Sequence, residues 1–503
     1  MSLLGIDAGT TGCKAAVYSE RGELLASAYE EYDVEHPQAG YAELNAGRVW
    51  EIVKGLIRRV ASQTNSRLIQ ALAVSSMGEA VVPVTRGRQI LGPSLLNFDR
   101  RGEAYVEDLR SKIDAETLFQ INGNTLGNQF SLTKLLWLKQ NEPALYSRAD
   151  FFLHWSGFVS FMLGAEPAVD YSLANRTLLF DLDRKSWSAE LMTLTGLNDG
   201  KLPPPVASGV VVGTVASGVA QELGLPAGLA IVSGAHDQNA NAIGCGVIEV
   251  GQAVFGMGTY ICMTPVYADR KNSAQMMAQG LNTEHHAVPG RYVSFIYNQG
   301  GALLKWYRDT FAVAEKRVGG SPGRDLYAEL ISEIPEAPST VLVLPHFIPT
   351  GPPEFVSDSS GVVLGLNLET TRGDILKGIL EGTIFYLKEC VDNLPAVGLE
   401  ISDFRAVGGG SRSDAWIQLS ADVFGIPFMR PKVIEAGALG AAILAGIGKG
   451  VFDDARAGVE AMVRPDRTFT PNPAQAKRYE RPYAQYRQIW PLMKEYLRSL
   501  SSH

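Results

Sequence analysis

The chain repeats one short pattern at two places about 250 residues apart. Each copy has an apolar run, a turn of small residues and a second extended run, and the two copies are Leu4–Cys13 and Val254–Met263. Two apolar runs joined by a Gly- and Thr-containing turn are typical of a β-hairpin. Because a repeat at this distance is typical of a duplicated domain, we expect two α/β halves with a cleft between them.

Length and charge are consistent with that organisation. A chain of 503 residues is too long for one ordinary core, and we expect domains at residues 1–246 and 247–503. The net charge is −8 without a basic block, which argues against a nucleic-acid partner. Apolar runs are too short for a membrane span, and the start lacks the basic residues of a signal peptide. The four cysteines are scattered without metal-like spacing, which indicates reduced thiols and favours a cytoplasmic location; they are Cys13, Cys245, Cys262 and Cys390.

The first turn, Ala8–Gly12, carries groups that can bind phosphate. Its backbone amides and the hydroxyls of Thr10 and Thr11 can donate to phosphate oxygens. Asp7 stands at the mouth of the turn, where a carboxylate can hold Mg²⁺ through water. No Gly-Lys-Ser/Thr follows, so the turn is not a Walker loop. An ordinary hairpin turn containing Asp and Gly is the alternative.

The central stretch places a carboxylate ahead of a second glycine turn. An apolar run from Ile231 leads to Asp237, and Gly256, Gly258 and Thr259 follow about twenty residues later. A carboxylate facing a phosphate cradle suits a base that accepts a hydroxyl proton. The alternative is that Asp237 only caps a helix that begins at this point.

Two further glycine clusters precede predicted helices. Gly300 and Gly301 open a helix that carries Lys305, which makes a second possible phosphate seat. Gly408–Ser413 lies between a predicted strand at 404–407 and a predicted helix at 414–423. Glycines at such a junction give room for a flat ring or a ribose beside the backbone.

Glu79, Asp99 and Arg100 are polar residues at the ends of apolar segments. A carboxylate between two apolar runs, as at Glu79, is unusual in a core. Asp99 and Arg100 follow the segment 92–98. These residues are either solvated edges and caps or a polar rim that binds sugar hydroxyls.

Hydrophobic spacing predicts the main elements of secondary structure. We expect Ser131 to cap a helix that ends at Asn141, and His154 to be a core residue on a helix over 149–164. The other expected elements are a strand at 69–75 and helices at 46–63, 371–396 and 435–447.

The motifs together, in order and spacing, resemble the FGGY carbohydrate kinases, the group that contains glycerol kinase, xylulokinase and gluconokinase. The resemblance covers nearly the whole chain and rests on Gly5–Gly12, Gly234–Gln238, Phe255–Thr259, Gly408–Ser413 and the segments 131–141 and 361–381. It implies two actin-like (ribonuclease H-like) domains with ATP and a small sugar or polyol in the cleft. It also implies Mg²⁺ as a cofactor and a homodimer.

The resemblance assigns roles by position. Asp237 looks like the catalytic base, and Asp7 like the carboxylate associated with Mg²⁺. The sugar side corresponds to Glu79, Asp99, Arg100 and Gln238. The nucleotide side corresponds to Thr10, Thr11, Lys14, Gly258, Thr259, Gly301, Lys305, Gly409, Gly410 and Ser413. Met257 leaves the register of the second phosphate turn open by about two residues.

The acceptor is less well defined. Glu79 resembles the polyol-binding Glu of glycerol kinases, but their preceding Arg is Gly78 here, so no cation is supplied locally beside Glu79. Xylulokinases tend to have Met-His at this place and Asn where Gln238 stands. We favour phosphorylation of a primary hydroxyl of a pentulose such as xylulose or ribulose, with glycerol or a tetritol as the alternative. A non-catalytic nucleotide sensor and an actin- or Hsp70-type ATPase remain open.

Overall fold

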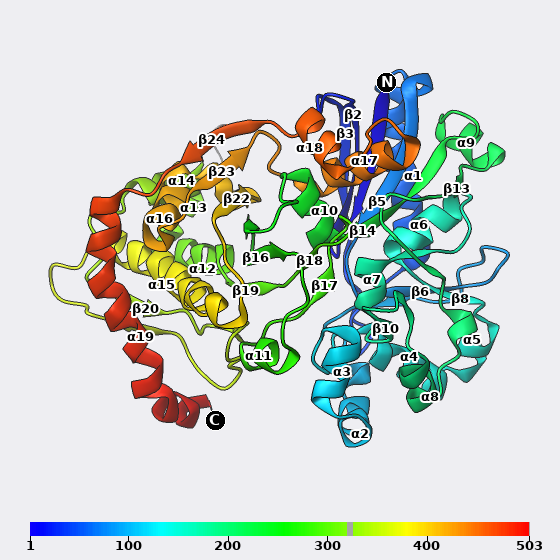
Figure 1. The fold of residues 1–503 in the computed structure, drawn as a ribbon. Coiled ribbons are helices and arrows are strands. Elements are labelled where there is room, and N and C mark those ends of the chain that lie inside the picture. The colour runs from blue at the N-terminus through cyan, green and yellow to red at the C-terminus, as the bar shows by residue number, and fades with distance from the viewer. Residues whose placement is uncertain (319–324, 502–503) are drawn as a thin grey trace.

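The computed structural model describes residues 1–318 and 325–501. Two halves lie side by side, each built around a mixed β-sheet with helices against its faces (Figure 1). The N-terminal half lies on the right of the view, and the C-terminal half, which ends in α19 (Pro473–Ser501), lies on the left. The expected two-part α/β organisation is confirmed.

The first sheet contains the first predicted hairpin. Its strands, in spatial order, are β13 (Val211–Thr214), β14 (Ala230–His236), β5 (Ile69–Ser76), β1 (Ser2–Ala8), β2 (Gly12–Ser19) and β3 (Leu24–Glu31). Strand β1 is antiparallel to β2, with Asp7 opposite Lys14, and parallel to β5. Strand β5 is in turn parallel to β14. The carboxyl ends of β1, β5 and β14 therefore meet at one edge, with Asp7 near the end of β1, Glu79 shortly after β5 and Asp237 directly after β14.

The second sheet repeats this plan. Its path is β17 (Glu284–His285), β18 (Tyr292–Val293), β16 (Tyr260–Tyr267), β15 (Gln252–Met257), β22 (Asp403–Val407), β23 (Phe428–Pro431) and β24 (Pro465–Phe469), with β19 (Ile296–Gln299) also on β16. Strand β15 is antiparallel to β16 and parallel to β22, which is parallel to β23. Because the pairing repeats that of β1, β2, β5 and β14, the structure confirms the duplication.

Two helices cross at the junction of the halves, α10 (Asp237–Gly244) and α17 (Ala436–Lys449) (Figure 1). Glycines allow the close crossing: a Cβ at Gly244 would overlap the Ala436 carbonyl, and a Cβ at Gly440 the Ala240 carbonyl. Helix α17 packs in one core with β1, β5 and β14 of the first sheet. Helix α10 in turn shares a core with β15 and β22 of the second. The boundary at 246/247 stays a prediction, and each half contributes a helix to the other's core.

Helices of the first half fall into two groups. Helices α1 (Ala46–Ser62), α6 (Trp155–Leu163) and α9 (Ser217–Leu223) share an apolar core with the first sheet, and α7 (Tyr171–Asn175) contacts β14. A separate apolar cluster contains α2 (Ala104–Lys112), α3 (Ala115–Asn122), α4 (Ser131–Asn141), α5 (Pro143–Arg148) and α8 (Ala189–Thr195). The helices of the second half include α11 (Ser273–Ala278), α12 (Gly301–Phe311), α13 (Val313–Val318), α14 (Leu326–Ser332), α15 (Arg372–Asn393), α16 (Asp414–Phe424) and α18 (Ala455–Met462). Short strands outside the main sheets include β6 (Val81–Val84) and β8 (Phe151–His154). Helices α1, α15, α16 and α17 confirm the sequence prediction to within three residues.

One predicted helix is wrong in its first turn. Residues 151–154 form β8, because they pair with β6 in an antiparallel register, Val81 opposite His154, and α6 begins only at Trp155. Tertiary pairing thus overrides the local helical pattern. His154 is buried, which raises the cost of its charged form and lowers the pKa of the imidazole to about 3. It is therefore a neutral core residue, as expected.

The start of α4 also differs from the prediction. Ser131 is the first helical residue rather than the cap, and its hydroxyl donates to the backbone carbonyl of Glu79 at 2.5 Å. This bond ties α4 to the loop that follows β5. Within the described part of the chain, no helix is both long enough and apolar enough to cross a membrane.

Candidate active site

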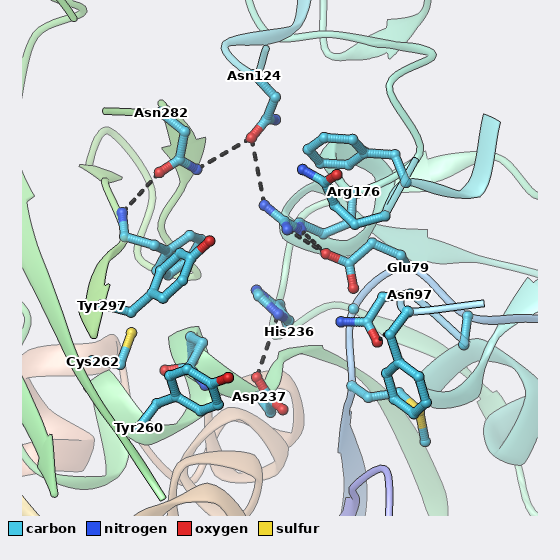
Figure 2. A pocket seen from close by; sticks show the side chains of 18 of the residues that line it. Glu79, Asn97, Asn124, Arg176, His236, Asp237, Tyr260, Cys262, Asn282 and Tyr297 are labelled. Atoms are coloured by element: carbon cyan, nitrogen blue, oxygen red, sulfur yellow. Dashed lines mark hydrogen bonds and ion pairs between the residues drawn. The ribbon is translucent and has the colours of Figure 1, made fainter. Parts of the chain in front are cut away.

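A cavity of about 750 Å³ lies at the junction of the two halves. The first half contributes Thr10, Glu79, Asp237 and Gln238 to its wall. Aromatic side chains of the second half, Tyr260 and Tyr297 among them, lie on the side opposite Glu79 (Figure 2). Two of the four residues expected on the sugar side, Glu79 and Gln238, thus lie on one cavity with the expected base Asp237. A polar cavity with aromatic walls is typical of a small-molecule site.

Asp237 is the first residue of α10, directly after β14. The cap residue of this helix is His236, so Asp237 is not the cap that the sequence left as an alternative. Its side chain is 27% exposed, and its Oδ1 lies 3.3 Å from His236 Nε2. Burial raises the pKa of the Asp237 carboxyl, and the neighbouring His236 opposes that rise. The arrangement leaves a carboxylate at the cavity wall with a cation beside it.

Glu79 has a cation partner from a distant part of the chain, although its sequence neighbour supplies none. Arg176, which follows α7, donates through Nε to Glu79 Oε1 at 2.9 Å, and its Nη2 contacts the same oxygen (Figure 2). A Cβ at Gly78 would lie 3.1 Å from His236 Nε2 and in ordinary contact with Arg176, 3.5 Å from its Nε, so a longer side chain there would compete with both for space. Burial alone would raise the pKa of Glu79, but Arg176 and His236 outweigh it and hold the pKa below the usual value.

Asp99 and Arg100 do not reach the cavity, so their expected substrate contacts do not fit this geometry. Asp99 is fully buried; it accepts from the Ala42 amide at 2.6 Å and forms an ion pair with Arg101 at 2.8 Å. Arg100 points outward with 69% of its side chain exposed and pairs with Glu103. Their neighbours Asn97 and Phe98 line the cavity instead.

Sequence reasoning missed a polar network around Arg176. Arg176 Nη1 donates to Asn124 Oδ1 at 3.4 Å, and Asn282 Nδ2 donates to the same oxygen at 3.3 Å (Figure 2). Glu284, completely buried, accepts from His236 and Asn239. The available signal was the buried carboxylate at Glu79, which requires a cation partner. The identity of that partner, 97 residues away, is set by the tertiary fold.

A second cavity, of about 1170 Å³, lies in the C-terminal half. Its lining includes all seven residues predicted for the nucleotide side in that half, namely Gly258, Thr259, Gly301, Lys305, Gly409, Gly410 and Ser413. Because β15 ends at Met257 and β16 begins at Tyr260, the second turn is Gly258–Thr259. Which residues of this turn contact phosphate stays a prediction.

The first turn of α12 does not offer free amides. Gly301 N donates to Gly258 O at 2.9 Å, and Ala302 N donates to Thr259 O at 3.0 Å. The predicted phosphate seat at this helix start is thus occupied by the neighbouring hairpin turn, while Lys305 still lines the cavity. Ser413, besides lining the cavity, caps α16 by accepting from Trp416 N at 3.2 Å.

Asp7 lies between the end of β5 and the start of α17. Ser75 Oγ donates to Asp7 Oδ1 at 2.6 Å, and the start of α17 approaches so closely that a Cβ at Gly437 would overlap Asp7. Burial raises the pKa of Asp7 to about 6, although the Ser75 bond opposes this shift and nearby Asp237 adds to it. Lys14 pairs with Glu435 at the cap of α17. Thr11 is exposed on the turn.

The duplicated halves, the polar cavity at their junction and the glycine-lined cavity beside it define a two-domain kinase of the actin-like, ribonuclease H-like fold. Comparisons with known proteins agree. The model of the FGGY family of carbohydrate kinases, N-terminal domain, matches residues 2–244, and that of the C-terminal domain matches residues 253–448. The chain belongs to the FGGY family of carbohydrate kinases, whose members are ATP-dependent phosphotransferases.

Individual relatives cover almost the whole chain. A xylulose kinase of Staphylococcus epidermidis is 27% identical over 98% of this chain and 97% of its own length. An autoinducer-2 kinase of Klebsiella pneumoniae is 28% identical over 97% of this chain and 93% of its own. The crystal structure of xylulose kinase from Rhodospirillum rubrum superposes with a TM-score of 0.87 at 26% identity, covering 99% of this chain and 100% of that one.

Filling the second cavity should weaken nucleotide binding. At Gly409 a Cβ would meet nothing within 4 Å, so Gly409→Leu is expected to fold and to extend into the space where adenosine is predicted. We expect the Kd for ADP, measured by calorimetry, to rise about tenfold, equivalent to about 1.4 kcal/mol. Gly218→Leu, at an equally open glycine in α9, is the matched control. An unchanged Kd in Gly409→Leu would place the nucleotide elsewhere.

Proposed function

We propose that the protein transfers the γ-phosphoryl group of ATP to a primary hydroxyl of a small sugar or polyol, with Asp237 as the catalytic base. The observation that carries this proposal is the position of Asp237, which lines the sugar-sized cavity at the end of β14. From there its carboxylate would orient the hydroxyl and accept its proton as the phosphoryl group moves. The amides and hydroxyls of the two hairpin turns would balance the charge on the phosphates.

Mg²⁺ fits the residues around Asp7. The charge of Asp237 lies close enough to Asp7 to raise the pKa of Asp7. Apart from its ion-pair contact with His236, Asp237 Oδ1 is buried without a hydrogen-bond partner among the described residues. A divalent cation near Asp7 would relieve that repulsion and neutralise phosphate charge. The described residues hold no cluster of three or more His, Cys, Asp or Glu side chains suited to a metal. This suits an ion that keeps several waters and binds phosphate oxygens.

The acceptor we favour is a pentulose such as xylulose or ribulose. A cavity of about 750 Å³ has room for five carbons, and Glu79, Gln238, Asn97 and Arg176 offer hydrogen-bonding groups around it. Relatives named as xylulose kinases support this choice. Glycerol or a tetritol is the second candidate, because Glu79 matches the polyol-binding carboxylate of glycerol kinases and now has an arginine beside it.

A panel of acceptors tests the proposal. ADP formation would be followed with D-xylulose, D-ribulose, erythritol and glycerol at equal concentrations, and kcat/KM compared. We expect a pentulose to exceed glycerol by at least about a hundredfold, because polar groups that lose their hydroxyl partners penalise the shorter polyol. The reverse order would identify the second candidate. A homodimer and a cytoplasmic location stay predictions.

A further inference from the structure

Five charged side chains of alternating sign, three of them buried and two partly buried, form a continuous chain beside the cavity. They run Glu79, Arg176, Glu284, His236 and Asp237. The first contact joins Arg176 Nε to Glu79 Oε1 at 2.9 Å, and the last joins His236 Nε2 to Asp237 Oδ1 at 3.3 Å. One end of this chain is therefore Glu79, the sugar-facing carboxylate, and the other end is Asp237, the candidate base (Figure 2).

Glu284 is the central member of this chain. Its Oε1 accepts from His236 Nδ1 at 3.0 Å and from Asn239 Nδ2 at 2.7 Å, and its Oε2 lies 3.5 Å from Arg176 Nη1. The side chain is completely buried. It belongs to β17 of the second sheet, whereas His236 and Arg176 belong to the first half. A buried carboxylate with two cationic neighbours needs both of them to offset its desolvation.

Glu284 orients the imidazole of His236 and the guanidinium of Arg176 at the same time. With Nδ1 held by Glu284, the imidazole of His236 presents Nε2 to Asp237, so one carboxylate oxygen of Asp237 is engaged and the other is left for a substrate hydroxyl. On the other side, Glu284 faces one arm of the Arg176 guanidinium while Glu79 takes the Nε edge. The ring of His236 also packs edge-on against Phe295, centroids 5.5 Å apart, which limits its rotation.

We propose that Glu284 is a positioning residue that holds Asp237 through His236 and Glu79 through Arg176. The candidate base and the sugar-facing carboxylate are thereby aligned with each other by a residue from the opposite half. This inference rests on the proposed role of Asp237. It assigns a function to two residues, Glu284 and His236, that do not themselves transfer a proton from the sugar. Loss of either link would leave the cavity intact but the base misaligned.

The charge of His236 provides a measurable signature. Burial disfavours its charged form, but Glu284 and Asp237 outweigh burial and raise the pKa of His236 to about 9, so the ring is a cation at neutral pH. A cation beside Asp237 favours the ionised base. The charged or titratable groups that face the pair from neighbouring elements are Arg176, Glu79, Asp7, His154, Asp170 and Glu284.

Two conservative variants test the proposal by steady-state kinetics and the pH profile of kcat, using D-xylulose or the best acceptor found. His236→Gln keeps a donor but loses the charge; we expect kcat to fall about 10- to 100-fold while the sugar KM changes less than twofold. Glu284→Gln should lower kcat similarly and also raise the sugar KM, because it loosens Arg176. In His236→Gln the acid limb of the profile should move to higher pH, since Asp237 loses the cation that favours its ionised form. Glu284→Gln should move the limb the same way, since without Glu284 the pKa of His236 falls and the ring is less often a cation.

Glu381→Gln is the matched control for neutralising a buried glutamate. Glu381 is 1% exposed in α15 and accepts from Ser339 N at 3.1 Å, outside both cavities. The Glu381→Gln substitution should leave kcat and the acid limb of the pH profile unchanged. If Glu284→Gln does not fold, Glu284→Asp is used, for which a smaller loss of kcat and an unmoved acid limb are expected.

Folded His236→Gln and Glu284→Gln with wild-type kcat and an unmoved acid limb would overturn the proposal. That outcome is distinguishable from failure of the proposed function, because Asp237→Asn would then still be inactive. An active Asp237→Asn would instead remove the base on which this inference rests.

Discussion

Asp237→Asn is expected to lower kcat by about 10²–10⁴-fold, because the amide cannot accept the proton of the attacking hydroxyl. The change is nearly isosteric, and Asp237 begins α10 without capping it, so the fold should persist. Asp237 lines the first cavity and not the second. The Kd for ADP should therefore stay within about twofold of wild type.

The measurement is single-turnover phosphoryl transfer together with ADP calorimetry on the same preparation. A variant that keeps more than about a tenth of the wild-type turnover would exclude general-base catalysis by Asp237. Loss of ADP binding in parallel would indicate that the substitution disturbs the junction of the halves rather than the chemistry.

Arg176→Ala should raise the sugar KM by at least about a hundredfold. Truncation leaves Glu79 and Glu284 as buried carboxylates without their shared cation, and breaking such a pair typically costs about 3–5 kcal/mol. Arg176→Lys keeps the charge but loses the planar fork that spans both carboxylates, so an intermediate KM is expected. Steady-state kinetics with varied sugar at saturating ATP give these values.

Arg100→Ala is the matched control for removing an arginine near the same cavity. The Arg100 side chain is 69% exposed and pairs only with Glu103 in a surface ion pair of small energetic value. Its sugar KM should equal that of wild type. A large KM effect in Arg100→Ala and none in Arg176→Ala would reverse the correction that the structure makes to the sequence assignment.

The sequence predicted the parts of this fold that depend on local pattern. The two hairpins, Leu4–Cys13 and Val254–Met263, follow from short-range alternation and turn chemistry, and both form. The turn at 258–259 likewise lines the second cavity, and so do Gly409 and Gly410 of the triple glycine. These features need no knowledge of distant residues.

The errors arise where a distant partner decides the outcome. Residues 151–154 form a strand because β6 pairs with them, which no local helical spacing reveals. Asp99 was expected to face the sugar, but Arg101 and the Ala42 amide bind it inside the fold. Arg176 reaches Glu79 only through the tertiary fold of the first half, and Glu284 reaches His236 only after the two halves assemble. The missing Arg at Gly78 was visible in the sequence, whereas its replacement by Arg176 was not.

The central claim is that both cavities act together, so that the γ-phosphoryl group passes to a sugar hydroxyl rather than to water. Phosphorus NMR of ATP, Mg²⁺ and enzyme, with and without D-xylulose or the best acceptor of the panel, tests it most directly. We expect one phosphate ester and one ADP for each ATP consumed when acceptor is present, and almost no ADP without it, because the base Asp237 lies on the sugar cavity. Release of inorganic phosphate at the same rate with and without acceptor would identify an ATPase of the same fold and contradict the account.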